Sequence, residues 1–171
     1  MSIADPVLRA LAHPVRLKMM TLMWPGPLSA AELARELGIS HALASQHLRK
    51  LDAAGLVELA EERRRRGGQE RRYRAVRGTP LSDQRDGSRD GGLRLAETLV
   101  HMLRERVGRR DPSLVGVTVD AELWVVPDEW ERFRERLAAL AAELHEAARP
   151  VRTPGTMPVG ISVMAFPMRH P

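Results

Sequence analysis

Hydrogen-bonding side chains recur at three- and four-residue intervals in the stretch ISHALASQHLRKLDAAGLV, residues 39–57. On a helix they would share one face, while the apolar residues between them would turn toward a core. A face with small residues and few acidic ones suits contact with base edges in the major groove of DNA, although an ordinary solvated helix face has the same pattern. The polar face holds His41, Ala42, Ser45, Gln46 and Arg49, and the apolar face holds Ala44, Leu48 and Leu51.

Both ends of this helix are marked in the sequence. Ser40 can cap its amino end, because a serine oxygen accepts a hydrogen bond from the free N–H groups of the first turn. Gly55 can end it, because glycine takes the left-handed backbone conformation without strain. A helix is therefore predicted over residues 40–55.

The elements expected before this helix are those of a helix-turn-helix. Short helices are predicted over Asp5–Leu11 and Val15–Met23. Ser29 and Glu32 have the spacing of a capping box, which would start a third helix that ends at Gly38. A helix, a short turn with a glycine and a second helix make up a helix-turn-helix.

A basic hairpin is predicted directly after the polar helix. Leu56–Glu62 and Arg71–Val76 can alternate as two short strands, with Gly67 and Gly68 in the turn. The run Arg63–Arg66 would project along a nucleic-acid backbone or into a minor groove, where guanidinium groups favour strongly negative stretches. A solvated run of charges is the alternative.

The net charge of +5 over 171 residues is unevenly distributed. Residues 1–80 hold 14 Lys and Arg against 8 Asp and Glu, whereas residues 81–171 hold 13 against 14. This asymmetry favours an amino-terminal unit that binds a polyanion. The chain has no cysteine, which excludes disulfides and thiolate metal sites. No apolar run approaches about 18 residues and the start lacks a signal-peptide core, so we expect a cytoplasmic protein without a membrane partner.

In order along the chain, these features resemble the ArsR/SmtB family of winged helix-turn-helix transcriptional regulators; MarR-type and other winged helices are close competitors. The resemblance covers roughly residues 5–78 and rests on LRALAHPVRLKMMTLM, SAAELARELGISHALASQHLRKLDAAGLV and a basic hairpin ending in YRAV. It implies that the polar helix reads the major groove and that the hairpin, or wing, contacts the DNA backbone. His47 matches a frequent family histidine, whose role here is phosphate contact, packing beneath the helix, or both. The predicted DNA-binding residues are Ser40, His41, Ala42, Ser45, Gln46, His47, Arg49, Lys50, Arg63, Arg64, Arg65, Arg66, Arg71 and Arg72.

A metal site is not predicted, although some regulators of this family sense metals. The helix after the wing offers Glu97, His101 and Glu105 at four-residue spacing. Zinc takes about four N, O or S ligands, and one histidine between carboxylates is more typical of surface ion pairs. A symmetric dimer that doubled these ligands is the alternative.

The second half of the chain is predicted to be an appended unit. Residues 79–92 have the composition of a flexible linker, and an amphipathic helix is predicted from Leu93 to Val107, where relatives dimerise or where it packs on its own chain. A strand, a helix and a second strand should follow, over Leu114–Val126, Pro127 to about Ala148 and Val159–Phe166. The two strands would be parallel neighbours or would pair across a dimer. Several large apolar residues of this unit would line an effector pocket or simply pack in its hydrophobic core. They are Trp124, Trp130, Met157, Met164 and Phe166.

The sequence thus predicts an α+β chain with a winged helix-turn-helix at residues 1–78, a linker at 79–92 and a dimerisation helix with a strand-helix-strand unit at 93–171. Neither a catalytic residue nor a cofactor is predicted. The expected function is sequence-specific binding of double-stranded DNA as a homodimer, most simply a repressor at an inverted-repeat operator. The alternatives are a sensor of a small molecule or metal with the same fold, and a winged helix that binds a protein.

Overall fold

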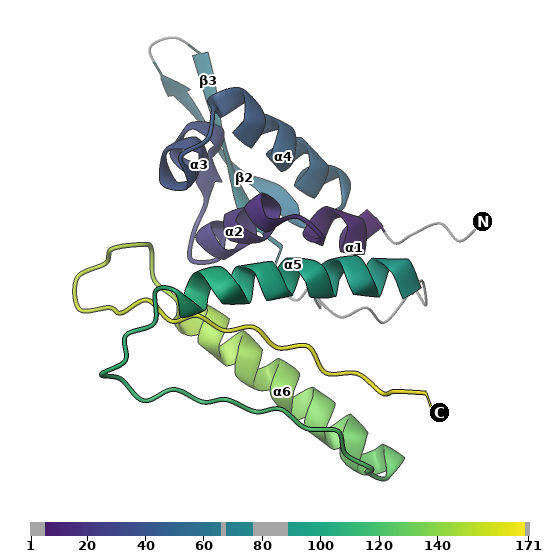
Figure 1. Cartoon of the computed structure of the whole chain (residues 1–171). Helices are drawn as coiled ribbons and strands as arrows, with labels where there is room; N and C mark the ends of the chain where they lie inside the picture. Colours follow the sequence, from purple (N-terminus) through teal and green to yellow (C-terminus); the bar gives the residue numbers. More distant parts are fainter. Residues whose placement is uncertain (1–5, 66–67, 77–88, 170–171) are drawn as a thin grey trace.

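The computed structural model describes residues 6–65, 68–76 and 89–169, and these contain six helices and three strands. Figure 1 shows the first four helices and the strands as one unit, with α5 lying across its base and α6 on the other side of α5. The predicted α+β fold class is confirmed. The elements are α1 (Pro6–Leu11), α2 (Pro14–Met23), β1 (Leu28–Ser29), α3 (Ala30–Leu37), α4 (His41–Ala53), β2 (Val57–Arg65), β3 (Gly68–Ala75), α5 (Arg89–Val107) and α6 (Pro127–Ala147).

The strands form one antiparallel sheet in the order β1-β3-β2. β1 contributes only two residues, and Leu28 pairs with Tyr73 of β3. Tyr73 also pairs with Leu59 on β2, where the register shifts by one residue before Glu61. The short β1 therefore ties the chain just before α3 to the base of the hairpin.

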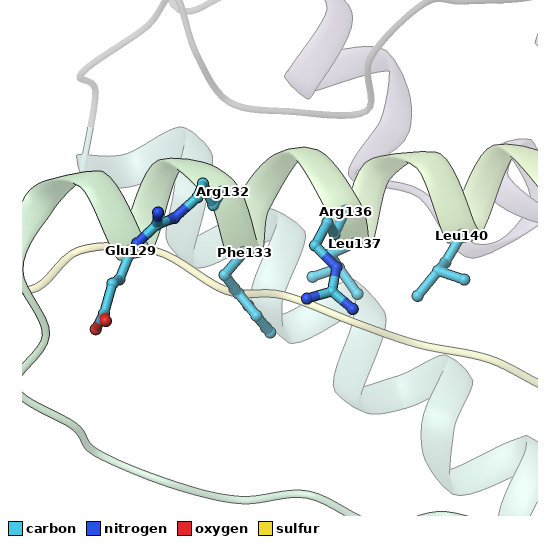
Figure 2. A pocket seen from close by; sticks show the side chains of 6 residues that line it. All are labelled: Glu129, Arg132, Phe133, Arg136, Leu137 and Leu140. Carbon is cyan, nitrogen blue, oxygen red and sulfur yellow. The ribbon is translucent and has the colours of Figure 1, made fainter.

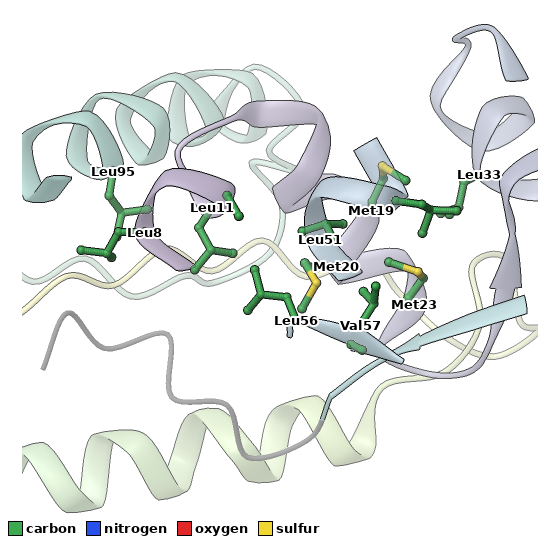
Figure 3. Packing of buried hydrophobic residues seen from close by; sticks show 13 residues of the cluster. Leu8, Leu11, Met19, Met20, Met23, Leu33, Leu51, Leu56, Val57 and Leu95 are labelled. Atoms are coloured by element: carbon green, nitrogen blue, oxygen red, sulfur yellow. The ribbon is translucent and has the colours of Figure 1, made fainter. Parts of the chain in front are cut away.

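One apolar core holds the amino-terminal helices on the sheet. Leu11, Met19, Met23, Leu33 and Leu51 are almost fully buried in it. Each buried side chain of this size contributes about 1.5–3 kcal/mol of transfer free energy. Figure 3 shows these side chains together with Leu95, through which α5 joins the same core.

The predicted caps are present at the helices of the helix-turn-helix. Ser29 and Glu32 form the capping box of α3, and Gly38 closes that helix with a φ of 65°. The Leu43 N–H donates to Oγ of Ser40 over 3.2 Å, so Ser40 caps α4 as expected. Gly55 follows α4 with a φ of 67° in the left-handed region.

The hairpin differs from the prediction in the length of its strands. β2 runs to Arg65 and β3 starts at Gly68, so Arg63, Arg64 and Arg65 lie in a strand and not in a loop. The strands stay paired through this stretch, where Arg63 lies opposite Glu70 and Arg64 lies opposite Gln69. Arg66 and Gly67 lie outside the described residues.

Helix α5 begins at Arg89, four residues before the predicted start. Gly91 and Gly92 disfavour a helix, which is why the sequence pattern assigns the first turn of α5 to the linker. The rest of the predicted linker, residues 79–88, lies outside the described part. The helix packs on α1 and α2 with Leu95, Thr98 and Met102 buried. No helix in the described part of the chain has the length and apolarity needed to span a membrane.

The two strands predicted beside α6 are absent from the described residues, and that prediction is wrong for the single chain. Residues 114–126 and 159–166 run as irregular segments on either side of α6, which itself matches the prediction. A strand needs a second strand hydrogen-bonded beside it, and among the described residues no strand lies beside either segment. Contacts with the amino-terminal unit come from His145, whose ring lies 4.4 Å from that of Trp24, and from Arg152, which pairs with Glu36.

Candidate nucleic-acid interface

Helix α4 presents one polar face to solvent and one apolar face to the core. Its exposed residues carry hydroxyl, amide, imidazole and cationic groups, and Ser45 beside them is half-buried. The only acidic residue on α4 is Asp52 in its last turn. The predicted DNA-binding residues that are exposed here are Ser40, His41, Ala42, Gln46, Arg49 and Lys50, so with Ser45 the structure brings together seven of them.

His47 lies on the opposite face. It is 5% exposed, and its ring packs against that of His13 with 4.6 Å between centroids. Of the two roles predicted for His47, this position favours packing beneath the helix. His13 caps α2, because its Nδ1 accepts a hydrogen bond from the Val15 N–H over 3.2 Å.

Both histidines are held neutral by their surroundings. Burial lowers the pKa of His47, and the nearby His13, Arg16 and Lys50 lower it further. Burial, Arg16 and Lys50 lower the pKa of His13 in the same way. The contact beneath α4 is therefore a junction that loses stability on protonation.

Arg16 is buried, and the sequence did not predict this structural role. Its guanidinium donates to the Ala10 carbonyl and, over 2.9 Å, to the Arg9 carbonyl. It thereby satisfies carbonyls at the end of α1, which have no partner within that helix. The sequence feature that could have indicated this role is the AHPVR motif, in which Arg16 follows the pair His13-Pro14 after one residue.

Most described arginines of the wing are paired with glutamates of the same sheet. The cross-strand pairs are Glu62 with Arg71 at 3.0 Å and Glu58 with Arg74 at 2.6 Å. Arg63 pairs with Glu61 on its own strand at 2.7 Å. The positive charge available to a polyanion is therefore smaller than the number of arginines in the sequence indicates.

Arg64 is different from these residues. It is exposed, it lies opposite Gln69, and it forms no ion pair with any described residue. Among the described wing arginines, its guanidinium is the one best placed to contact a phosphate. The side chains of Arg65 and Arg66 lie outside the described part.

Arg72 faces the body of the domain and not the solvent. Its side chain is 16% exposed, and Nη2 donates to the Pro27 carbonyl over 2.8 Å and to Oε1 of Glu32 over 3.2 Å. Burial raises the pKa of Glu32, but the hydrogen bonds with Ser29 and the charges of Arg72 and Arg35 outweigh it and lower the pKa overall. Arg72 thus joins β3 to the capping box of α3.

Glu105, one of the residues considered for a metal, pairs with a lysine in the structure. Glu105 pairs with Lys18 of α2 over 2.9 Å, while His101 Nε2 lies 4.0 Å from the same carboxylate. Within the described residues no group of three or more metal-binding side chains forms. The pair Lys18–Glu105 instead connects α2 to α5.

The residues considered for an effector pocket do not enclose a cavity in the single chain. Trp124, Met157 and Phe166 are each more than half exposed. Figure 2 shows a surface hollow whose lining comes entirely from α6 and includes none of the five predicted residues. Its lining consists of Glu129, Arg132, Phe133, Arg136, Leu137 and Leu140.

The amino-terminal unit matches known proteins. Residues 11–60 fit the family model described as a helix-turn-helix domain. An uncharacterized HTH-type transcriptional regulator of Methanocaldococcus jannaschii is 43% identical over 49 residues, which are 29% of this chain and 52% of that protein. The chain therefore spans about half the length of this curated relative.

Solved structures give weaker matches. The transcriptional repressor BigR of Xylella fastidiosa is 23% identical, with a TM-score of 0.37 and coverage of 61% of this chain and 85% of that one. A winged helix-turn-helix domain of Mycobacterium bovis, described as a possible ArsR-family regulator, is 26% identical, with a TM-score of 0.35 and coverage of 59% and 77%. Residues 11–60, which include α2, α3 and α4, therefore match a helix-turn-helix domain.

Proposed function

We propose that the chain is a transcriptional regulator of the ArsR type that binds double-stranded DNA. Helix α4 would lie in the major groove, and the β2–β3 wing would contact the flanking backbone. The relative from Methanocaldococcus jannaschii, named as an HTH-type transcriptional regulator, supports the same role. Such a protein would act in the cytoplasm, where it has access to genomic DNA.

The exposed polar face of α4 carries this proposal. Ser45 and Gln46 offer hydroxyl and amide groups to base edges, and glutamine pairs with adenine through two hydrogen bonds. Arg49 and Lys50 extend the same exposed side with positive charge. The buried His47 and Leu48 hold this face outward, because they anchor the helix to the core.

The proposed regulator acts as a homodimer and a repressor. Leu93, Val100, Leu103 and Val107 form an exposed apolar row on α5, beside the buried stripe that packs on α1 and α2. A two-fold dimer would require an inverted-repeat operator with half-sites about one or two helical turns apart. A dimer bound across such a site would block other proteins from it, which favours repression.

The test is DNA binding measured by fluorescence anisotropy on a site selected from random DNA and on a scrambled duplex. Arg63→Ala combined with Arg64→Ala should weaken binding to both duplexes. The slope of log binding constant against log salt concentration should become shallower by about 0.9 for each phosphate that the variant no longer neutralises. Arg132→Ala on α6 is the matched control, since it removes an exposed arginine away from the wing.

Gln46→Ala should act differently from the wing variant. It should reduce discrimination between the selected and scrambled duplexes by about 5- to 150-fold, which corresponds to about 1–3 kcal/mol for one two-hydrogen-bond base contact. Equal affinities of wild type for both duplexes, or a wing variant that binds as tightly as Arg132→Ala, would contradict the proposal. A winged helix that binds a partner protein would then become the better interpretation.

A further inference from the structure

Two segments flanking α6 have the sequence pattern of strands. In the first extended segment, residues 115–126, the odd positions are Val115, Val117, Val119, Ala121, Leu123 and Val125. In the second extended segment, residues 157–166, the odd positions are Met157, Val159, Ile161, Val163 and Ala165. Uninterrupted apolar residues at every second position are typical of a strand with one buried face.

Neither segment has a strand beside it in the described part of the single chain. Val115, Val117 and Val119 are 101%, 90% and 84% exposed. Among the described residues, no hydrogen bond between two backbone groups involves positions 115–123 or positions 157–166. Figure 1 shows both segments alongside α6 with no strand next to them. A strand-like apolar face of this kind marks an interaction surface.

The second extended segment is held in place on its other side. Arg106 of α5 donates through Nη1 to the Ile161 carbonyl over 2.6 Å and to Oγ of Ser162 over 2.5 Å. A Cβ at Gly160 would lie 3.2 Å from Cδ of Arg106, so the arginine packs closely on the backbone there. Gly160 and Ser162 therefore lie against Arg106 of α5. In a strand, the odd positions on either side of them would point the other way.

We propose that the two extended segments pair as strands with the same segments of a second copy of this chain. This inference rests on the proposed homodimer and not on DNA binding. Each copy would bring two strands, so that the dimer would hold a sheet built across its two-fold axis. Such an interface uses the same surface on both subunits.

The exposed area fits a dimer. The odd positions carry nine large apolar side chains that are on average about two-thirds exposed. A fully exposed side chain of this size offers about 60–120 Å², so these nine offer roughly 400–700 Å² per copy. Each partner in a stable complex buries about 800 Å², so they supply a large share of the area that a dimer needs.

Charge also favours a second copy over a charged partner. The second extended segment has no charged residue, and the first has only Asp120 and Glu122, both at even positions. The interacting face is thus uncharged and cannot attract nucleic acid or a strongly acidic or basic protein. A second copy carries the identical apolar face and is present wherever this chain is.

The test measures the mass of the full chain by light scattering after gel filtration. Wild type should elute as two copies of 19.1 kDa. Val117→Asp combined with Val119→Asp should weaken dimerisation at least 100-fold, because it places charges on the odd face. Thr118→Asp is the matched control on the even face of the same segment and should remain dimeric. A monomeric wild type, or a dimeric double variant, would overturn the proposal.

Hydrogen exchange of the wild-type chain tests the strand pairing without any variant. At least every second amide of residues 115–123 should be protected from exchange, because antiparallel pairing hydrogen-bonds alternate residues of a strand. In the single chain no other backbone group is hydrogen-bonded to these amides. A dimer in which these amides exchange freely would overturn the pairing. The two proposals can fail separately. A dimeric wild type that does not bind DNA would refute DNA binding and leave the strand pairing standing. A monomer that binds DNA would refute the homodimer and the strand pairing and leave DNA binding standing.

Discussion

Replacement of Arg72 by alanine should destabilise the whole domain, because this guanidinium joins the sheet to α3. The change removes hydrogen bonds to the Pro27 carbonyl and to the Glu32 carboxylate at a side chain that is 16% exposed. Hydrogen bonds that involve a charged group contribute about 1.5–3 kcal/mol each. The Glu32 carboxylate keeps its 2.8 Å hydrogen bond from the Ser29 N–H, which limits the stability lost when Arg72 no longer pairs with it. We therefore expect the unfolding free energy to fall by about 2–3 kcal/mol.

Urea unfolding followed by circular dichroism measures this decrease, with the denaturant slope unchanged if only stability is affected. For a chain of this size the midpoint temperature should fall by roughly 5–10 °C. Arg71→Ala is the matched control, since Arg71 is exposed and pairs only at the surface, where an ion pair contributes about 0–1 kcal/mol. If Arg72→Ala leaves the unfolding free energy unchanged and instead weakens DNA binding, the structural role argued for Arg72 is refuted.

Two further predictions concern the junctions around α4. The surroundings lower the pKa values of His13 and His47, so the folded state favours their neutral forms. Their contribution to stability is therefore present above about pH 6.5 and is lost as the pH falls below it. The unfolding free energy should fall by at most about 1.4 kcal/mol per pH unit for each histidine. Urea unfolding at pH 7.5 and 5.5 measures this, and His47→Leu should flatten the profile; equal stability of wild type at both pH values would contradict it. Gly55→Ala should cost about 1–2 kcal/mol, because φ is 67° in open space and only backbone strain opposes the methyl group. An unchanged urea midpoint would contradict that reasoning.

The sequence was informative where structure depends on near neighbours. The capping box of Ser29 and Glu32, the cap at Ser40 and the left-handed Gly55 all involve residues within a few positions of each other. Such local chemistry was sufficient to predict α1 to α4 and the exposed face of α4. Whether the residues of that face contact DNA stays a prediction.

The features that sequence reasoning missed depend on distant partners. Arg72 lies next to other basic residues within a short stretch of sequence, and nothing local indicates that its partners are Pro27 and Glu32, forty or more positions away. Arg63 lies in a strand because that part of the hairpin is paired, with Glu70 opposite it on β3. The alternation in residues 115–126 is typical of a strand, but a pattern cannot show whether the neighbouring strand belongs to the same chain.

The short connection between α3 and α4 limits how this protein can vary in length. Gly38 closes one helix and Ser40 opens the next, so only Ile39 separates two capping residues. Because each helical residue turns the chain by about 100°, one inserted residue that joined α4 would rotate its exposed face away from its present direction. Sequences descended from this one should therefore tolerate exchanges on the surface of α4 far better than an insertion or deletion between residues 38 and 40.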